Sequence, residues 1–202
     1  NFPDLNGVWC MMDGLKIPIQ ASGDRRTQNA YYNGWLHDHF VNAVFVFAPS
    51  GTIVACTLNA PGSWHDSFIA QNGGLYDKLD EVFHSTGGRC VVDAAFSRVR
   101  CPYLVKSGER CFGDYNLLVN RIKVQATSLR QAAEWGMRAL QGSFPRLKDR
   151  ITFSDEASDR KVFLNLIPMI YNFRMHYVGL NQIRSTFYPN FEVNGDHVLD
   201  IF

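Results

Sequence analysis

Residues 7–19, GVWCMMDGLKIPI, decide how this chain folds. The apolar run ends at Asp13-Gly14 and resumes at Leu15, which predicts a buried strand that is interrupted at the glycine. A carboxylate is costly to bury unless a cation meets it. The acid on this strand therefore indicates either an ion pair or a bound metal.

Further strands follow the first one along the chain. After a polar loop at residues 20–33, two runs rich in β-branched and aromatic residues, 41–47 and 53–58, flank the turn Ala48-Pro49-Ser50-Gly51 and predict a hairpin. Residues 89–96 predict a short buried strand that carries Asp93 near its end. The pattern gives three antiparallel strands and then a fourth.

Helices are predicted between and after these strands. Residues 63–82 predict a helix that begins with a capping box of Ser63 and Asp66 and is weakened at Gly73-Gly74. Residues 128–140 predict a helix with Ser128 as its cap and Gly142 as its stop, and residues 159–177 predict a last helix kinked at Pro168. Residues 97–128 are mixed and basic and predict no defined element.

Three acids stand out by their context: Asp13 on the first strand, Asp93 at the end of the fourth, and Glu134 inside a later helix. Three antiparallel strands, a helix, a fourth strand parallel to the first and a further helix form the RNase H-like order, an α/β fold in which such acids converge. Convergent carboxylates suit Mg²⁺ (or Mn²⁺), and two such ions can promote an in-line phosphoryl displacement. The alternative for Glu134 is an ion pair, since Arg130 and Arg138 each lie four residues away.

Composition sets the class of protein. A chain of 202 residues with 46% hydrophobic residues is expected to form one domain, residues 1–202, and no apolar run is long enough to cross a bilayer. The chain opens without Met, inside a segment with the pattern of structured sequence, so we expect it to be a fragment of a longer protein. Its five cysteines, with no CxxC pair, indicate reduced thiols.

The charge is unevenly distributed, although the net charge is only +1. Residues 96–150 hold eleven Lys or Arg and four acids, a balance of +7. A solvated basic face explains this bias, and a phosphate-binding surface is the functional alternative. Seven basic residues are the candidates for phosphate contacts: Arg98, Arg100, Lys106, Arg121, Lys123, Arg146 and Lys148.

Five segments in order resemble the catalytic domain of PIF/Harbinger transposases, which are DDE superfamily endonucleases. Residues 12–19 resemble the family's "DGTHIPI", residues 31–51 its "YYNGW…vfapdG", and residues 59–67 its "PGSxHDS". Residues 91–96 resemble "xxDxgY", and residues 134–148 resemble "ErxFGxLKxrF". The departures are Leu15 and Lys16 in place of Thr and His, Phe96 in place of Tyr, and a longer spacing at residues 137–143.

The resemblance implies a metal-dependent DNA endonuclease and strand-transfer enzyme with a DDE triad of Asp13, Asp93 and Glu134. Asp66 is the competing second acid and a further metal ligand, and His65 would orient it. The resemblance also implies DNA as substrate, a Myb-like DNA-binding partner, oligomers on DNA and a location in the nucleus. Two alternatives stay open: a domesticated descendant that binds DNA or a partner without transposition, and an RNase H-like nuclease that acts on another nucleic acid.

Two smaller features have both a structural and a functional interpretation. The segment His37-Asp38-His39 suggests a transition-metal site, but surface hydrogen bonding explains it more simply. Trp35 and Trp64 are able to stack on bases, whereas packing is the commoner role of a tryptophan.

Overall fold

A computed structural model describes residues 4–96, 101–107, 117–151, 157–179 and 181–186. A six-stranded sheet has the order β2-β3-β1-β5-β6, and β4 also pairs with β3. The strands are β1 (Val8–Pro18), β2 (Tyr32–Asn33), β3 (Asp38–Phe47), β4 (Ile53–Pro61), β5 (Arg89–Val92) and β6 (Leu104–Lys106). β3 runs antiparallel to both β1 and β4, whereas β5 runs parallel to β1. This arrangement confirms the predicted RNase H-like α/β fold class.

The central strand β1 is continuous, so the predicted break at Gly14 is wrong. Gly14 pairs with Val44 of β3, and the antiparallel register runs unbroken from Met11 to Pro18. Pairing with ten-residue β3 on one side fixes the backbone through the glycine, whose low strand propensity is thereby overridden. The predicted hairpin of β3 and β4 is confirmed, with a tight turn closed by a hydrogen bond from the Gly51 amide to the Ala48 carbonyl (2.8 Å).

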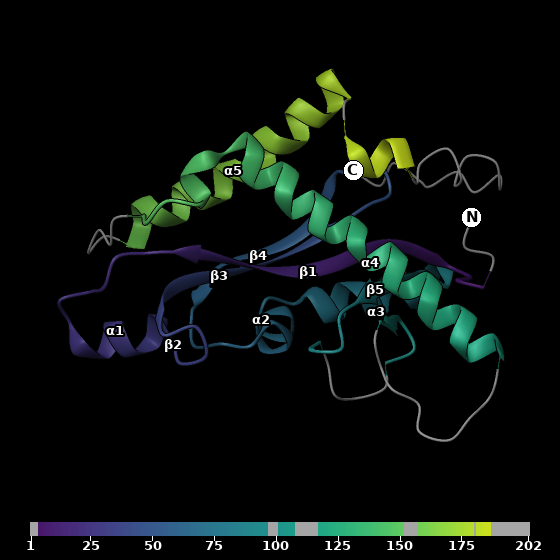
Figure 1. Cartoon of the computed structure of the whole chain (residues 1–202), viewed down its shortest axis with the longest axis horizontal. Coiled ribbons are helices and arrows are strands. Elements are labelled where there is room, and N and C mark those ends of the chain that lie inside the picture. The colour runs from purple at the N-terminus through teal and green to yellow at the C-terminus, as the bar shows by residue number, and fades with distance from the viewer. Residues whose placement is uncertain (1–3, 97–100, 108–116, 152–156, 180, 187–202) are drawn as a thin grey trace.

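Helices cover both faces of the sheet (Figure 1). The helices α2 (Asp66–Asn72) and α3 (Leu75–Thr86) lie on one face, and α4 (Leu117–Ser143) and α5 (Ala157–Val178) lie on the other. A short helix α1 (Arg25–Tyr31) precedes β2, and a 3₁₀ turn η1 (Pro145–Leu147) follows α4. None of the helices within the described residues has the combined length and apolarity that a membrane span requires.

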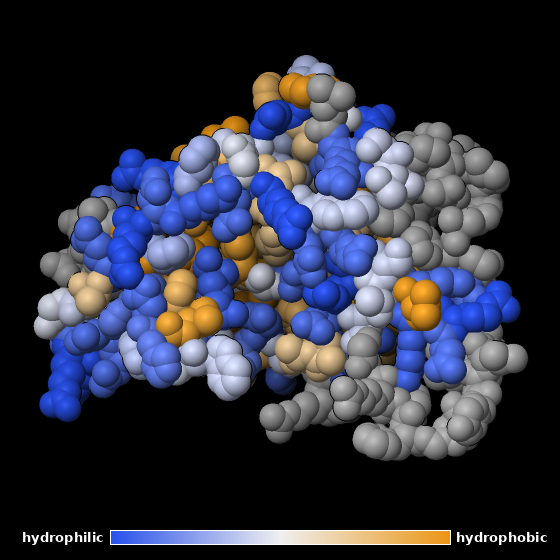
Figure 2. All heavy atoms as spheres, in the orientation of Figure 1, coloured by the Kyte–Doolittle hydropathy of each residue, from blue (hydrophilic) through white to orange (hydrophobic). Residues whose placement is uncertain are grey.

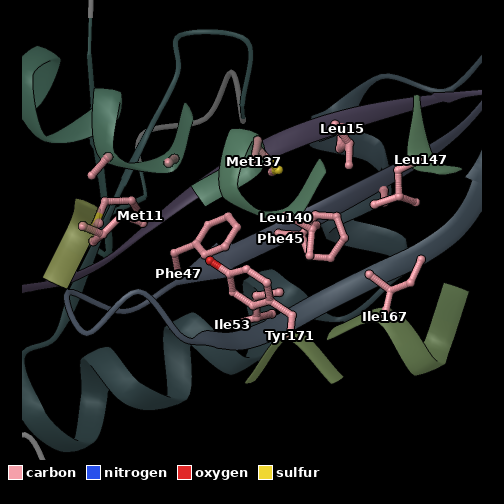
Figure 3. Close-up of a cluster of buried hydrophobic side chains, with 14 of the residues drawn as sticks. Met11, Leu15, Phe45, Phe47, Ile53, Met137, Leu140, Leu147, Ile167 and Tyr171 are labelled. Atoms are coloured by element: carbon pink, nitrogen blue, oxygen red, sulfur yellow. The ribbon is translucent and has the colours of Figure 1, made fainter. Parts of the chain in front are cut away.

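Alternate residues of β1 divide the core into two clusters. Met11, Leu15 and Ile17 pack with α4 and α5, whereas Cys10 and Met12 pack with α2 and α3. Figure 3 shows the first cluster, in which the rings of Phe45, Phe47 and Tyr171 meet side chains of α4, including Met137 and Leu140. By this alternation Asp13 belongs to the α4 face and Gly14 to the α2 face.

Several helix boundaries differ from the predictions. The polar loop at residues 20–33 contains α1, which Asp24 caps by accepting a hydrogen bond from the Thr27 amide (2.8 Å). The helix predicted at residues 63–82 is two helices, because Gly74 has a left-handed backbone (φ 71°) that ends helical continuity between α2 and α3. Ser128 lies inside α4 and does not cap it, while that helix ends one residue after Gly142. The last helix spans Pro168 as predicted.

Thiols behave as the cysteine pattern predicts in the part of the chain that the structure describes. Cys10, Cys56, Cys90 and Cys101 are free, and Cys10 and Cys90 are fully buried. Cys111 lies outside the described residues.

Candidate active site

The candidate site begins where β5 stops beside β1. β5 has four residues, and its parallel pairing with β1 ends at Met12 opposite Val92. Among the described residues no strand pairs with that edge of β1 from Asp13 to Pro18. A gap therefore opens in the sheet, with Asp13 on one side and Asp93, the residue after β5, on the other.

Asp13 is held inside this gap by its own strand. Its Oδ1 accepts a hydrogen bond from the Gly14 amide (2.8 Å). Burial raises the pKa of Asp13 to about 6 against an ordinary value of 3.8; the Gly14 amide and Arg130 lower it, and Asp66 and Asp93 raise it. The carboxylate of Asp13 is thus within electrostatic range of both of the other aspartates and of Arg130.

Asp93 is positioned by the turn that follows β5. Its Oδ1 accepts a hydrogen bond from the Ala94 amide (2.6 Å), and its carbonyl accepts one from the Phe96 amide (3.1 Å). Phe96 is buried in the cluster beneath α2 and α3, so its ring anchors the turn. The Phe that replaces the family's Tyr therefore serves packing, and a hydroxyl there would have to enter an apolar core.

Glu134 reaches the same face of the sheet as Asp13, because α4 lies on that face. Its Oε1 forms an ion pair with Nη2 of Arg130 one helical turn earlier (2.8 Å). Arg130 also lowers the pKa of Asp13. The structural alternative for Glu134, pairing with Arg130, is therefore present, and the same arginine links Glu134 electrostatically to Asp13.

Asp66 lies on the opposite face, beneath Gly14. A Cβ built on Gly14 would come within 2.5 Å of Cγ and Oδ2 of Asp66, so the missing side chain of the glycine makes the space that the carboxylate fills. Burial raises the pKa of Asp66, Lys16 and His65 lower it, and Asp93 raises it. Lys16 shares the face of Gly14 by strand alternation and supplies the positive charge on this side.

The capping box predicted for Asp66 is wrong. α2 begins at Asp66, its N-cap is His65, and no side chain caps this end. The chain is still extended at His65 (φ −77°, ψ 149°) because the preceding loop is tied elsewhere. The aspartate therefore has no capping role to explain it.

A buried asparagine on β3 ties this loop to the sheet. Nδ2 of Asn42 donates to the carbonyls of Trp64 (2.9 Å) and Gly62 (3.4 Å), and Nδ2 of Asn33 also donates to Gly62 (3.0 Å). The Ser63 amide donates to the Ala30 carbonyl (3.2 Å). These bonds fix where α2 starts and so place Asp66 under the gap.

Comparison of the sequence with protein families agrees with the order of strands and helices and with the acids around the gap. The family model of the DDE superfamily endonuclease matches residues 12–167, which include Asp13, Asp66, Asp93 and Glu134. The chain belongs to the DDE superfamily endonucleases. No curated protein and no solved structure matches it at a significant level.

The donor set of this DDE endonuclease domain fits a hard divalent cation. The groups at the gap are carboxylates, whose pKa is raised mainly by burial and further by the neighbouring aspartates, and a bound cation would offset both effects. In the described part of the chain, no three His, Cys, Asp or Glu side chains lie close enough together to hold a metal ion as they stand. Glu134, held by Arg130, would have to turn toward Asp13 to join such a site.

The predicted phosphate contacts divide into four groups. Arg98 and Arg100 lie outside the described residues. Arg121 is exposed but pairs with Asp4 (3.0 Å), so part of its charge is used within the domain. Lys106 and Lys123 are half-buried on β6 and α4, whereas Arg146 and Lys148 are exposed at and just after η1.

The remaining candidates are the His37-Asp38-His39 segment and two tryptophans, and the structure explains all but Trp35 by contacts within the domain. Asp38 forms a two-bond ion pair with Arg150 (2.6 and 3.0 Å), which supports the structural interpretation of the His37-Asp38-His39 segment. Trp64 packs edge-on against Phe68, with ring centroids 4.7 Å apart. Trp35 is 90% exposed, so packing does not explain it.

Sequence reasoning missed three contributors to the site. Gly14 supplies space, Asn42 places the loop before α2, and Lys16 balances Asp66. The sequence shows a signal only for Lys16, which stands where the family has a histidine.

Proposed function

We propose that this DDE endonuclease domain is the catalytic core of a PIF/Harbinger-type DNA transposase that cuts and rejoins DNA with divalent metal, Mg²⁺ or Mn²⁺. The observation that carries the proposal is the gap beside β1, where Asp13, Asp66 and Asp93 influence one another electrostatically. Half-buried acids beside other acids are unfavourable for folding, and such clusters mark functional sites. The family match supports the same chemistry.

Each side chain has a distinct role in this proposal. Asp13 and Asp93 hold metal from the two strands that flank the gap, and Glu134 completes the site from α4. Asp66 adds negative charge from the α2 face, and exposed His65 faces solvent beside it. Bound metal would activate the attacking oxygen and stabilise the leaving oxygen of an in-line phosphodiester displacement.

The rest of the proposal concerns partners. The substrate is DNA, both transposon ends and target. The phosphate contacts come from two exposed basic side chains after α4, Arg146 and Lys148. Sequence recognition comes from a Myb-like partner, the protein assembles into oligomers on DNA, and it acts in the nucleus. The exposed Trp35 is the candidate for stacking on a base.

The test is Mg²⁺- or Mn²⁺-dependent nicking of a labelled terminal-repeat duplex by the protein with its DNA-reading partner. Asp93→Asn should lose nicking almost completely, because removal of one anionic ligand weakens metal binding and disturbs the in-line geometry. DNA binding should remain or strengthen slightly, since negative charge beside phosphate is removed. Mn²⁺ binding, followed by calorimetry, should weaken in parallel.

Two further variants locate the second acid. Asp66→Asn should also reduce nicking, because its carboxylate lies at the gap and caps no helix. Asp77→Asn is the matched control: Asp77 is an exposed acid in the first turn of α3, and its loss should change nothing. Loss of nicking in Asp66→Asn with full activity in Asp93→Asn would transfer the second catalytic role to Asp66.

A second candidate function is a domesticated DNA- or partner-binding protein. The ion pair between Arg130 and Glu134 favours it, because this glutamate already has a cationic partner. Wild-type protein that binds DNA and Mn²⁺ but never nicks would support the binder. Nicking of RNA or of branched junctions in preference to the duplex would support an RNase H-like nuclease with another substrate.

A further inference from the structure

Helix α5 carries apolar side chains on two sides. One side packs into the core through Leu164, Ile167, Tyr171 and Met175, all buried. The other side exposes a second set, which we term the α5 stripe. The stripe consists of Val162, Leu166, Met169, Ile170, Phe173 and Tyr177, each between 46% and 70% exposed.

The spacing of the stripe is that of a helix-pairing seam. Val162, Leu166, Met169 and Phe173 follow one another at intervals of four, three and four residues, which keeps them along one line of a helix. Ile170 and Tyr177 widen the line, and the rings of Phe173 and Tyr177 lie against each other, with centroids 4.4 Å apart. Figure 2 shows apolar surface along the upper edge of the molecule, where α5 lies in Figure 1.

The area of the stripe matches a specific interface. From the exposed fractions, the six residues present roughly 700 Å² of accessible surface per chain, so two copies facing each other would bury at most about 1,400 Å² through the stripe alone, which reaches the range of stable protein pairs. A contiguous apolar patch of this size on a single protein marks an interaction site. The stripe is continuous along one straight element, so it is able to pair with itself about a twofold axis.

Charge at the two ends of α5 selects the direction of such a pair. Asp159 and Lys161 lie exposed near the start of α5 and their charges offset each other, whereas Arg174 and His176 lie exposed near its end and leave that end positive. A parallel pair would bring the two Arg174 side chains together, whereas an antiparallel pair separates them and also opposes the helix dipoles. The centre of the stripe, at Met169 and Ile170, would then lie near the twofold axis.

We infer that the α5 stripe is the interface of a homodimer, in which two copies of this chain pair their α5 helices antiparallel. The dimer forms without DNA, so this inference goes beyond the proposed function. The proposed function concerns the acids at the gap beside β1, none of which belongs to the α5 stripe. Failure of the dimer to form would leave the nicking experiment unaffected.

The test is the mass of the 202-residue chain in solution, measured by light scattering and sedimentation over concentrations up to about 100 μM. Wild-type chain should have twice the single-chain mass of 22.9 kDa. Met169→Glu with Phe173→Glu should reduce it to the mass of one chain, a loss of at least about 100-fold in dimer affinity because two charges would be buried in each half. The circular dichroism spectrum should stay unchanged, since both side chains are exposed in the single chain, while the melting temperature should fall and lose its dependence on protein concentration because the dimer no longer forms.

Val124→Glu is the matched control. Val124 is 70% exposed on α4, away from the stripe, so the same change in chemistry should leave the dimer intact. Ile170→Cys should form a disulfide-linked dimer above the wild-type background and Val162→Cys should not, because only the central position meets itself in an antiparallel pair. Wild-type chain at single-chain mass throughout, an unaltered dimer in the Glu variant, or cross-linking of Val162→Cys equal to that of Ile170→Cys would each overturn the inference.

Discussion

The substitution Gly14→Ala would move the carboxylate of Asp66 without removing its charge. The new Cβ would lie 2.5 Å from Cγ and Oδ2 of Asp66 and 2.7 Å from Oδ1, whereas carbon and oxygen atoms in contact lie about 3.5 Å apart. The carboxylate must therefore retreat by about 1 Å. It is the far end of a flexible side chain, so the fold should tolerate the retreat.

The expected result is a stable but impaired Gly14→Ala protein. Replacing a strand glycine by alanine contributes about 0.5–1 kcal/mol to stability, which offsets the cost of moving Asp66, so the free energy of unfolding should stay within about 1 kcal/mol of wild type. Nicking should fall by up to about 100-fold, the scale of a 1 Å misplacement at a reacting site. Urea unfolding and the nicking assay measure the two effects separately.

Gly23→Ala is the control, because no atom lies within 4 Å of the Cβ it would add. If Gly14→Ala nicks DNA at the wild-type rate while Asp66→Asn does not, the charge of Asp66 matters and its position beneath Gly14 does not. If neither variant affects nicking, Asp66 has no part in the site, and the close fit to Gly14 is packing alone.

The remaining predictions concern the charge of Asp13, the packing of α4 against β3, and the basic residues after α4. Because the pKa of Asp13 is raised, the folded protein holds the Asp13 proton more tightly than the unfolded chain does, so the free energy of unfolding should fall as pH rises from about 4 to about 6 and stay lower above that. Asp13→Asn should therefore raise the free energy of unfolding at pH 7.5 by up to about 3 kcal/mol and leave it unchanged below pH 4. Urea titrations at the two pH values measure both effects. Gly136→Ala should destabilise the domain by about 1–3 kcal/mol and lower its melting temperature, because the added Cβ would come within 2.8 Å of the ring of Phe47, which is fully buried and has no room to move away. A melting temperature equal to that of wild type would mean that α4 can move off the sheet. Replacing Arg146 and Lys148 with Ala should weaken binding to all DNA sequences alike and reduce the salt slope by about one unit per lost phosphate contact, whereas an unchanged slope would assign both bases to solvent.

The sheet was predictable because its strands have distinct patterns. The hairpin of β3 and β4 is visible as two β-branched runs around Pro49 and Gly51, and β5 as a short apolar run before Asp93. Pairing partners then follow from the order of strands and helices, since a strand that returns after a helix adds parallel to the first. The positions of Asp13 and Asp93 at the gap are consequences of that order.

Other parts of the site depend on contacts that no local pattern contains. The sequence around Ser63 and Asp66 has the form of a capping box, but Asn42, more than twenty residues earlier, holds the carbonyls of Gly62 and Trp64 and delays the helix to Asp66. Tertiary hydrogen bonds outweighed a local preference worth about 1 kcal/mol. The fit of Asp66 under Gly14 is likewise a contact between faces of different elements.

The short length of β5 explains why aspartates from both faces of one sheet can act on each other. On a complete sheet, Asp13 on the α4 face and Asp66 on the α2 face would be separated by a layer of paired backbone. β5 stops at Val92, so the edge of β1 is open at the level of Asp13, and Gly14 brings no side chain into the opening. Each face supplies one basic side chain: Arg130 lowers the pKa of Asp13, and Lys16 lowers the pKa of Asp66. Neither cation fully offsets the effect of burial, since both pKa values stay raised. A gap built in this way destabilises the folded chain at neutral pH, and a divalent cation bound at the gap would restore that loss.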